Sequence, residues 1–141
     1  MNLSGLAVAA LVREFEADPA RDLLVIHDEL DLVLGSFKIK ERGSPAGHNG
    51  ARSVTGALGS QEWLRLRIGV GLDLPPEAVA AGGRRPGKDY LLSPLRKADL
   101  TVLDEVLDRV ATATRRILEA GPAAAMNEFN RKEDRDQGLR D

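Results

Sequence analysis

A glycine-containing loop over residues 43–50 closes with Gly47-His48-Asn49-Gly50, just before a short helix predicted over about residues 51–58. Backbone N–H groups at the start of a helix attract an anion or a developing negative charge. His48 and Asn49 would add polar side chains beside those N–H groups. For Asn49 alone the ordinary alternative is a helix N-cap, and the sequence leaves both interpretations open.

A second group, His27-Asp28-Glu29-Leu30-Asp31, follows the apolar run of residues 23–26. Because that run is apolar on both faces, it predicts a central strand of an α/β sheet, and ligands bind at the carboxyl ends of such strands. Carboxylates there could bind a metal ion, orient a histidine or act as a general base, with a solvated acidic loop as the alternative. The spacing matches no metal-binding motif, and with only two histidines and no cysteine we predict no metal site.

A third group consists of basic side chains that recur with a period of two. Lys38 and Lys40 alternate with apolar residues in one predicted strand, and Arg65 and Arg67 do so in another. This period places each pair on one face of its strand. Paired cations on adjacent strands suit phosphate binding, and ordinary solvated strand faces are the alternative.

The charge is also unevenly distributed along the chain. Residues 36–71 carry six basic against two acidic side chains, whereas residues 13–35 carry two against seven. This predicts a polarised molecule with a basic strip beside the glycine-containing loop. Aromatic residues make up only 4% of the chain, which argues against base stacking as the main mode of nucleic-acid recognition.

Strands and helices must position these groups, and hydrophobic periodicity predicts where they lie. Apolar residues at helical spacing predict a helix over residues 6–15, with Ser4 or Asn2 as its N-cap and Asp18-Pro19 closing it. The other predicted elements are strands over 37–40 and 63–71, a long loop over 73–87, a helix over about 97–120 ended by Gly121-Pro122, and a last short helix over 123–129.

Length and composition set the outer limits. A chain of 141 residues suits one domain, which we place at residues 1–130, followed by a charged tail at residues 131–141 that we expect to be frayed. A net charge of -2 excludes a polycation that coats nucleic acid. No apolar run approaches the roughly 20 residues of a membrane helix, and the absence of cysteine excludes a disulfide framework.

Taken together, five blocks of the sequence resemble the bacterial-type peptidyl-tRNA hydrolase family, in the family's order and over the chain up to about Asn130. The blocks are Met1-Asn2-Leu3-Ser4-Gly5, Val25-Ile26-His27-Asp28-Glu29-Leu30-Asp31-Leu32, Gly47-His48-Asn49-Gly50, Arg65-Leu66-Arg67-Ile68-Gly69-Val70-Gly71 and Ala125-Met126-Asn127-Glu128-Phe129-Asn130. The resemblance implies a single α/β domain around a mixed β-sheet flanked by helices. It implies an aminoacyl- or peptidyl-tRNA hydrolase, which cleaves the ester between a peptide and the 3′ end of tRNA with an activated water and no metal or cofactor.

The same resemblance implies roles for residues of the first two groups. Asp28 would orient and polarise a catalytic histidine, and Asn49 would position the attacking water and the tRNA end. Asn2 would hold the peptide main chain, Met1 would line the same groove, and His48 would line the cleft. The implied partner is the acceptor end of peptidyl-tRNA, and we expect a monomer without membrane association.

For the basic residues, the resemblance implies phosphate binding. Lys40 and Arg67 match the family's pair that grips the 5′-phosphate of the acceptor stem. Lys38 and Arg65 lie beside them in sequence. All four are therefore predicted to contact tRNA phosphate.

The chain also departs from the family pattern. In the family, the Met1 block is internal, and the preceding segment supplies the first central strand and the catalytic histidine, to which neither His27 nor His48 corresponds. The resemblance therefore predicts that this chain represents the C-terminal two-thirds of the domain, lacks N-terminal strand structure and is inactive alone. Ser44-Pro45 replaces glycine-rich residues, and Pro45 is expected to stiffen the loop.

A non-catalytic RNA-binding or RNA-processing relative on the same scaffold is the competing interpretation. The presence of Asp28, Asn49 and Asn2 favours the enzyme, because RNA binding alone requires no water-positioning group. The absence of cysteine and of a signal peptide favours the cytoplasm. A mitochondrial location is the alternative if a presequence preceded Met1.

Overall fold

The structure is a computed structural model that describes residues 3–45, 48–71 and 96–130. Several sequence-based predictions fall outside these residues: Met1, Asn2, the loop at 73–87 and the tail at 131–141. Within the described ranges, no helix combines the length and the apolar character needed to cross a membrane.

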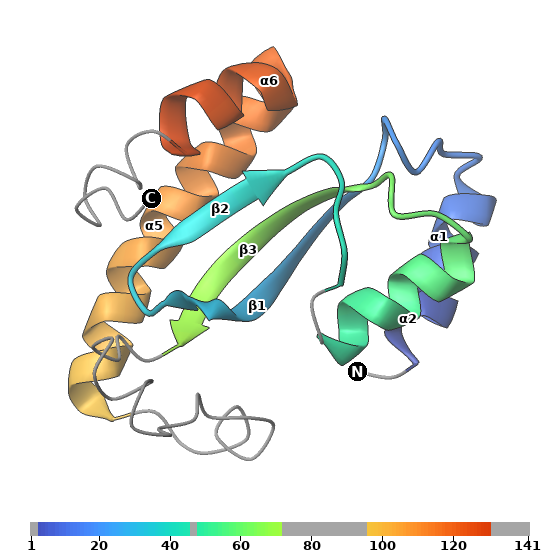
Figure 1. Cartoon of the computed structure of the whole chain (residues 1–141). Coiled ribbons are helices and arrows are strands. Elements are labelled where there is room, and N and C mark those ends of the chain that lie inside the picture. The colour runs from blue at the N-terminus through green and yellow to red at the C-terminus, as the bar shows by residue number, and fades with distance from the viewer. Residues whose placement is uncertain (1–2, 46–47, 72–95, 131–141) are drawn as a thin grey trace. The chain divides into compact units, whose positions relative to one another are not determined.

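The chain divides into two compact units, each described by itself below. The first unit comprises residues 1–27 and 39–66, and the second comprises residues 28–38 and 67–141. The three described strands form one sheet in the order β1-β3-β2 and are drawn in Figure 1: β1 (Leu24–Val33), β2 (Phe37–Lys40) and β3 (Leu64–Gly71). Because β1 runs parallel to β3 and β2 runs opposite to it (Figure 1), the sheet is mixed, which confirms the predicted α/β class.

Strand β1 differs from its prediction in two ways. The acidic residues lie inside the strand and not beyond its carboxyl end, because β1 continues through Val33. In the described sheet β1 is an edge strand and β3 is the central one, so the prediction of a central strand at residues 23–26 is wrong. The apolar residues Leu30 and Leu32 extend the strand pattern past the charged group, which explains its length.

Two glycines of β3 allow it to approach β1 closely within the second unit. A Cβ atom on Gly69 would lie 2.1 Å from the carbonyl oxygen of Val33, and one on Gly71 would lie 2.1 Å from that of Leu30. Leu34 donates its backbone N–H to the carbonyl oxygen of Gly71 at 3.0 Å. Only residues without a Cβ can therefore occupy positions 69 and 71 at this spacing.

In the first unit, helices α1 (Ser4–Glu14) and α2 (Asn49–Leu58) pack together. The Gly5 N–H donates to the Ser53 Oγ at 2.9 Å. A buried cluster lies beside this contact and consists of Ala51, Val54 and Trp63, with Val8, Leu23, Val25 and Leu58 packed against it. The helix pair and the start of β3 therefore share one apolar core.

The ends of α1 differ from the prediction. Ser4 is the first helical residue, Leu3 occupies the N-cap position, and no side chain caps the helix. The helix ends at Glu14, well before Asp18-Pro19, because Glu16 adopts a left-handed conformation with φ 51°.

The second unit contains helix α5 (Lys97–Ala120), whose predicted bounds are confirmed. Its buried face consists of Val106, Val110, Ala113 and Ile117. After Gly121 the chain forms α6 (Pro122–Ala125) and the π-helical turn η1 (Met126–Asn130), where a single short helix was predicted. The Phe129 ring of η1 lies 6.0 Å from the Phe37 ring, and Arg109 of α5 donates to the Gly35 carbonyl oxygen at 2.5 Å.

The contact between α1 and α2 can be tested with two helical glycines. Gly5→Ala is expected to destabilise the protein by about 1–3 kcal/mol, because its methyl group would overlap a backbone carbonyl. The ideal Cβ lies 2.0 Å from the Ser53 oxygen. The matched control is Gly56→Ala in α2, which meets nothing within 4 Å and is expected to stabilise by about 0.5–1 kcal/mol through helix propensity. Urea unfolding measures both, and a Gly5→Ala midpoint at or above that of the wild type would contradict the close contact.

Candidate functional site

The N-terminus of α2 is capped by a histidine. The His48 Nδ1 accepts a hydrogen bond from the Ala51 N–H at 3.0 Å, and the His48 N–H donates to the Pro45 carbonyl oxygen at 2.9 Å. Asn49 is the first residue of the helix and is exposed, so the interpretation of Asn49 as the N-cap is wrong. Because Nδ1 is the acceptor, Nε2 carries the proton of the neutral imidazole.

The capping imidazole contacts a second histidine in the first unit. The rings of His27 and His48 are tilted by 49° and their centroids lie 4.6 Å apart. His27 comes from β1 and is half-buried. Nothing in the sequence indicated this contact, because the two residues are distant along the chain and belong to separate blocks. The structure thus brings together two residues that the prediction assigned to different groups.

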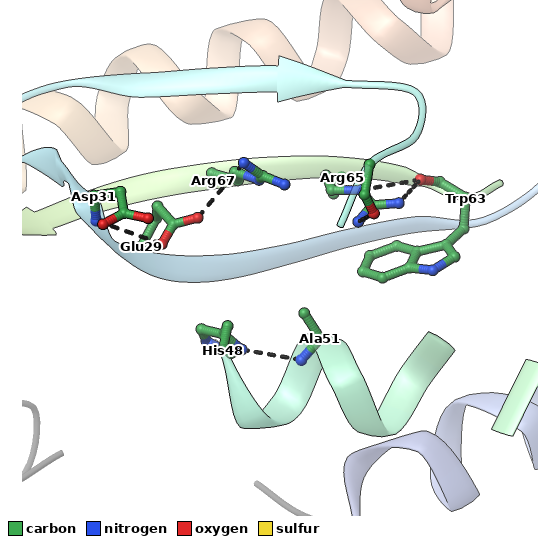
Figure 2. Close-up of polar contacts among 8 residues, drawn as sticks. Glu29, Asp31, His48, Ala51, Trp63, Arg65 and Arg67 are labelled. Carbon is green, nitrogen blue, oxygen red and sulfur yellow. Dashed lines mark hydrogen bonds and ion pairs between the residues drawn. The ribbon is translucent and has the colours of Figure 1, made fainter. Parts of the chain in front are cut away.

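A buried ion pair lies in the second unit. An oxygen of Glu29 lies 3.6 Å from a guanidinium nitrogen of Arg67, with side-chain exposures of 5% for Glu29 and 13% for Arg67. Figure 2 shows this pair together with Asp31, whose N–H donates to the Glu29 carboxylate at 3.4 Å. Glu29 therefore compensates the charge of an arginine that the sequence assigned to phosphate. Asp28, half-buried, is its neighbour in β1 and projects from the opposite face.

Arg65 is buried, with 0% exposure, instead of lying on a solvated strand face. Its guanidinium donates to three backbone carbonyl oxygens, those of Gly43 at 2.9 Å, Gln61 at 2.6 Å and Trp63 at 3.1 Å. It also lies over the Trp63 ring, 3.6 Å from the centroid. This burial argues against the predicted phosphate contact by Arg65 and limits the predicted basic strip to the other cations.

The alternation predicted for β2 is confirmed. Phe37 and Ile39 are buried, Lys38 is half-buried and Lys40 is exposed. Lys40 and Arg67 belong to different units, so their pairing on one phosphate stays a prediction. The substrate-binding roles of Met1 and Asn2 stay predictions as well, since both residues lie outside the described ranges.

Among residues 3–45, 48–71 and 96–130, no three histidine, cysteine, aspartate or glutamate side chains are grouped closely enough to hold a metal ion.

The fold matches solved enzymes of one class, the peptidyl-tRNA hydrolases. A crystal structure of peptidyl-tRNA hydrolase from Acinetobacter baumannii at 1.00 Å resolution superposes with a TM-score of 0.74 and 27% identity, over 92% of this chain and 61% of that chain. A complex of peptidyl-tRNA hydrolase with N-propanol gives the same values. The matched part of this chain therefore corresponds to 61% of the length of those chains.

Sequence comparison identifies the family. The peptidyl-tRNA hydrolase of Acidobacterium capsulatum is 57% identical over 133 residues, and that of Koribacter versatilis is 49% identical over 132 residues. These alignments cover 94% of this chain but only 65% and 62% of the two relatives. The family model for peptidyl-tRNA hydrolase matches residues 1–137. The chain belongs to the peptidyl-tRNA hydrolase family.

The ion pair in the second unit gives a stability prediction. Glu29→Leu is expected to cost about 3–5 kcal/mol, because it leaves the Arg67 guanidinium buried without its carboxylate. The double variant Glu29→Leu/Arg67→Met removes both charges and is expected to recover most of that loss. Urea unfolding of the wild type, Glu29→Leu, Arg67→Met and the double variant completes the double-mutant cycle. A double variant as unstable as the sum of the single changes would show that the pair does not couple.

Proposed function

We propose that this chain acts in the hydrolysis of the ester that joins a peptide to the 3′ end of tRNA. The observation that carries the proposal is Asn49, exposed in the first turn of α2 next to the capping imidazole of His48. Membership of the peptidyl-tRNA hydrolase family supports the substrate class.

The chemistry needs three things of the protein. Water must be oriented toward the ester carbonyl carbon, its proton must be accepted, and the developing charge on the carbonyl oxygen must be stabilised. The Asn49 side-chain amide can hydrogen-bond the water and the tRNA end, and the first N–H groups of α2 favour negative charge. Asp28 would polarise the family's catalytic histidine, which accepts the proton and to which neither His27 nor His48 corresponds. The ester bond breaks to give a free peptide carboxylate and the 3′-hydroxyl of tRNA.

Cleavage of N-acetylaminoacyl-tRNA, followed by release of the acetylated amino acid, tests the proposal. The assay compares the 141-residue chain with a form to which the segment that precedes the Met1 block in the family is fused at the N-terminus. Hydrolysis by either form supports the proposal, whereas RNA binding without cleavage by both would favour a non-catalytic RNA-binding relative. In the active form, Asp28→Asn is expected to slow hydrolysis by about 10²–10⁴-fold and Asn49→Ala by about 10²-fold or more. Asp108→Asn on the exposed surface of α5 is the matched control and should leave the rate unchanged.

We also propose that Lys40, Arg67 and Lys38 bind tRNA phosphate. Lys40 is exposed at the end of β2, and the Arg67 side chain beside Glu29 keeps 13% exposure. Arg65 is left out of this set because it is buried. The remaining cations would attract the phosphate backbone of tRNA. This attraction depends on salt concentration and not on base sequence.

The salt dependence of binding to a tRNA acceptor-stem minihelix tests the phosphate contacts. Lys40→Ala is expected to weaken binding and to reduce the slope of log K against log salt by about 1, because one counterion fewer is released. Arg13→Ala, in the last turn of α1, is the control and should leave the slope unchanged. An unchanged slope for Lys40→Ala would remove Lys40 from the proposed set.

A further inference from the structure

We propose that Arg65 is a positioning residue that fixes the loop before α2 and thereby places His48 and Asn49. This inference rests on the proposed function, because it is the hydrolytic role of Asn49 that gives the positioning its purpose. It assigns Arg65 a task different from phosphate binding. Every contact on which it depends lies within the first unit.

The guanidinium of Arg65 joins two stretches of backbone that are distant in the sequence. Its partners are the carbonyl oxygens of Gly43 in the loop, Gln61 before β3, and Trp63 at the start of the strand region. Because Arg65 has 0% exposure, its N–H groups donate to acceptors inside the protein. A tRNA phosphate cannot replace these acceptors without disrupting the loop. The contact with the Trp63 ring adds compensation for the buried charge.

Trp63 provides a second attachment, on the helix itself. Its Nε1–H donates to the Thr55 Oγ1 at 3.1 Å, and its ring lies in the core with Ala51 and Val54 of α2. The stacked pair of Arg65 and Trp63 therefore holds the segment from Gly43 to Thr55 at both of its ends. His48 and Asn49 lie between these two attachments.

The start of the loop needs such an attachment because Gly43 constrains its own backbone weakly. Gly43 has φ 147°, a region that residues with a side chain rarely adopt, and glycine can leave it at little cost. The hydrogen bond from Arg65 fixes the carbonyl group of this residue. The Pro45 carbonyl oxygen accepts a hydrogen bond from the His48 N–H, and His48 caps α2. Fixing the Gly43 carbonyl group therefore helps to fix the position of Asn49.

The geometry also explains why an arginine occupies this position. A planar guanidinium can donate to several carbonyl oxygens in fixed directions while stacking on an aromatic ring. A lysine ammonium keeps the charge but has neither the fork nor the flat face. Arg65→Lys therefore separates positioning from charge: a phosphate contact would survive it in large part, and the positioning would not.

Hydrogen exchange and RNA binding on the full chain test the proposal. In Arg65→Lys, the amides of Ser44, His48 and Ala51 are expected to exchange about tenfold faster or more, while amides of α5 are unchanged. The salt slope of minihelix binding should stay at the wild-type value, and in a form active on N-acetylaminoacyl-tRNA kcat should fall with little change in KM. Arg52→Lys, the same change at an exposed position of α2, is the matched control and should alter none of these.

Other outcomes would overturn the proposal. Unchanged exchange in the loop of Arg65→Lys would overturn the positioning role. A salt slope lowered by about 1 in Arg65→Gln, which removes the charge, would make Arg65 a phosphate-binding residue. If Arg65→Lys does not fold, Arg65→Gln, which buries no charge, is measured with the same readouts and the same interpretation. If the loop amides respond but no form cleaves the ester, the positioning role stands and the proposed hydrolysis fails.

Discussion

Strand β3 carries two arginines, Arg65 and Arg67, whose side chains are largely shielded from water. The requirement to compensate their charges determines the polar contacts around the strand. A buried cation without partners is too costly to retain. Arg65 is compensated by backbone carbonyl groups and the Trp63 ring, whereas Arg67 is compensated by the carboxylate of Glu29. The partners come from separate segments of the chain. The two guanidinium groups therefore fix a loop in the first unit and part of β1 in the second.

The two forms of compensation have different consequences for RNA binding. Glu29 neutralises Arg67, so a phosphate would have to share that guanidinium with a carboxylate already in place. The ion pair with Glu29 weakens the long-range attraction of Arg67 for an anion. It also holds the planar guanidinium in one orientation, which suits hydrogen bonding to an anion at short range. Lys40 is exposed and supplies a flexible point charge instead. In the proposed phosphate contacts, Lys40 would contribute mainly long-range attraction, and Arg67 would contribute mainly a fixed hydrogen-bonding geometry.

Sequence reasoning succeeded where a long local pattern determined the structure. The amphipathic repeat of α5 and its stop at Gly121 gave the helix bounds as observed, and the alternation of β2 gave its buried and exposed residues. It failed for Arg65, because alternating charged and apolar residues ordinarily indicate a solvated strand face. The Gly43 carbonyl oxygen accepts a hydrogen bond from the buried guanidinium and so compensates its charge. Gly43 is distant from Arg65 along the chain, and no sequence pattern identifies its carbonyl group as the acceptor. The cap of α2 was missed because Asn-Gly is the commoner signal and a histidine cap depends on its tautomer.

In the proposed reaction, the residue that would contact the substrate differs from the residues that would hold it in position. Asn49 is held by α2, α2 is held by Trp63 through Thr55, and the loop before it is held by Arg65 through Gly43. None of these supports need contact tRNA, yet a small displacement of a water-positioning amide is enough to lower a hydrolytic rate. A run of arginines in a strand next to a candidate RNA site is therefore not evidence of RNA contact by each of them. The burial of Arg65 is the observation that separates it from the cations proposed to bind phosphate.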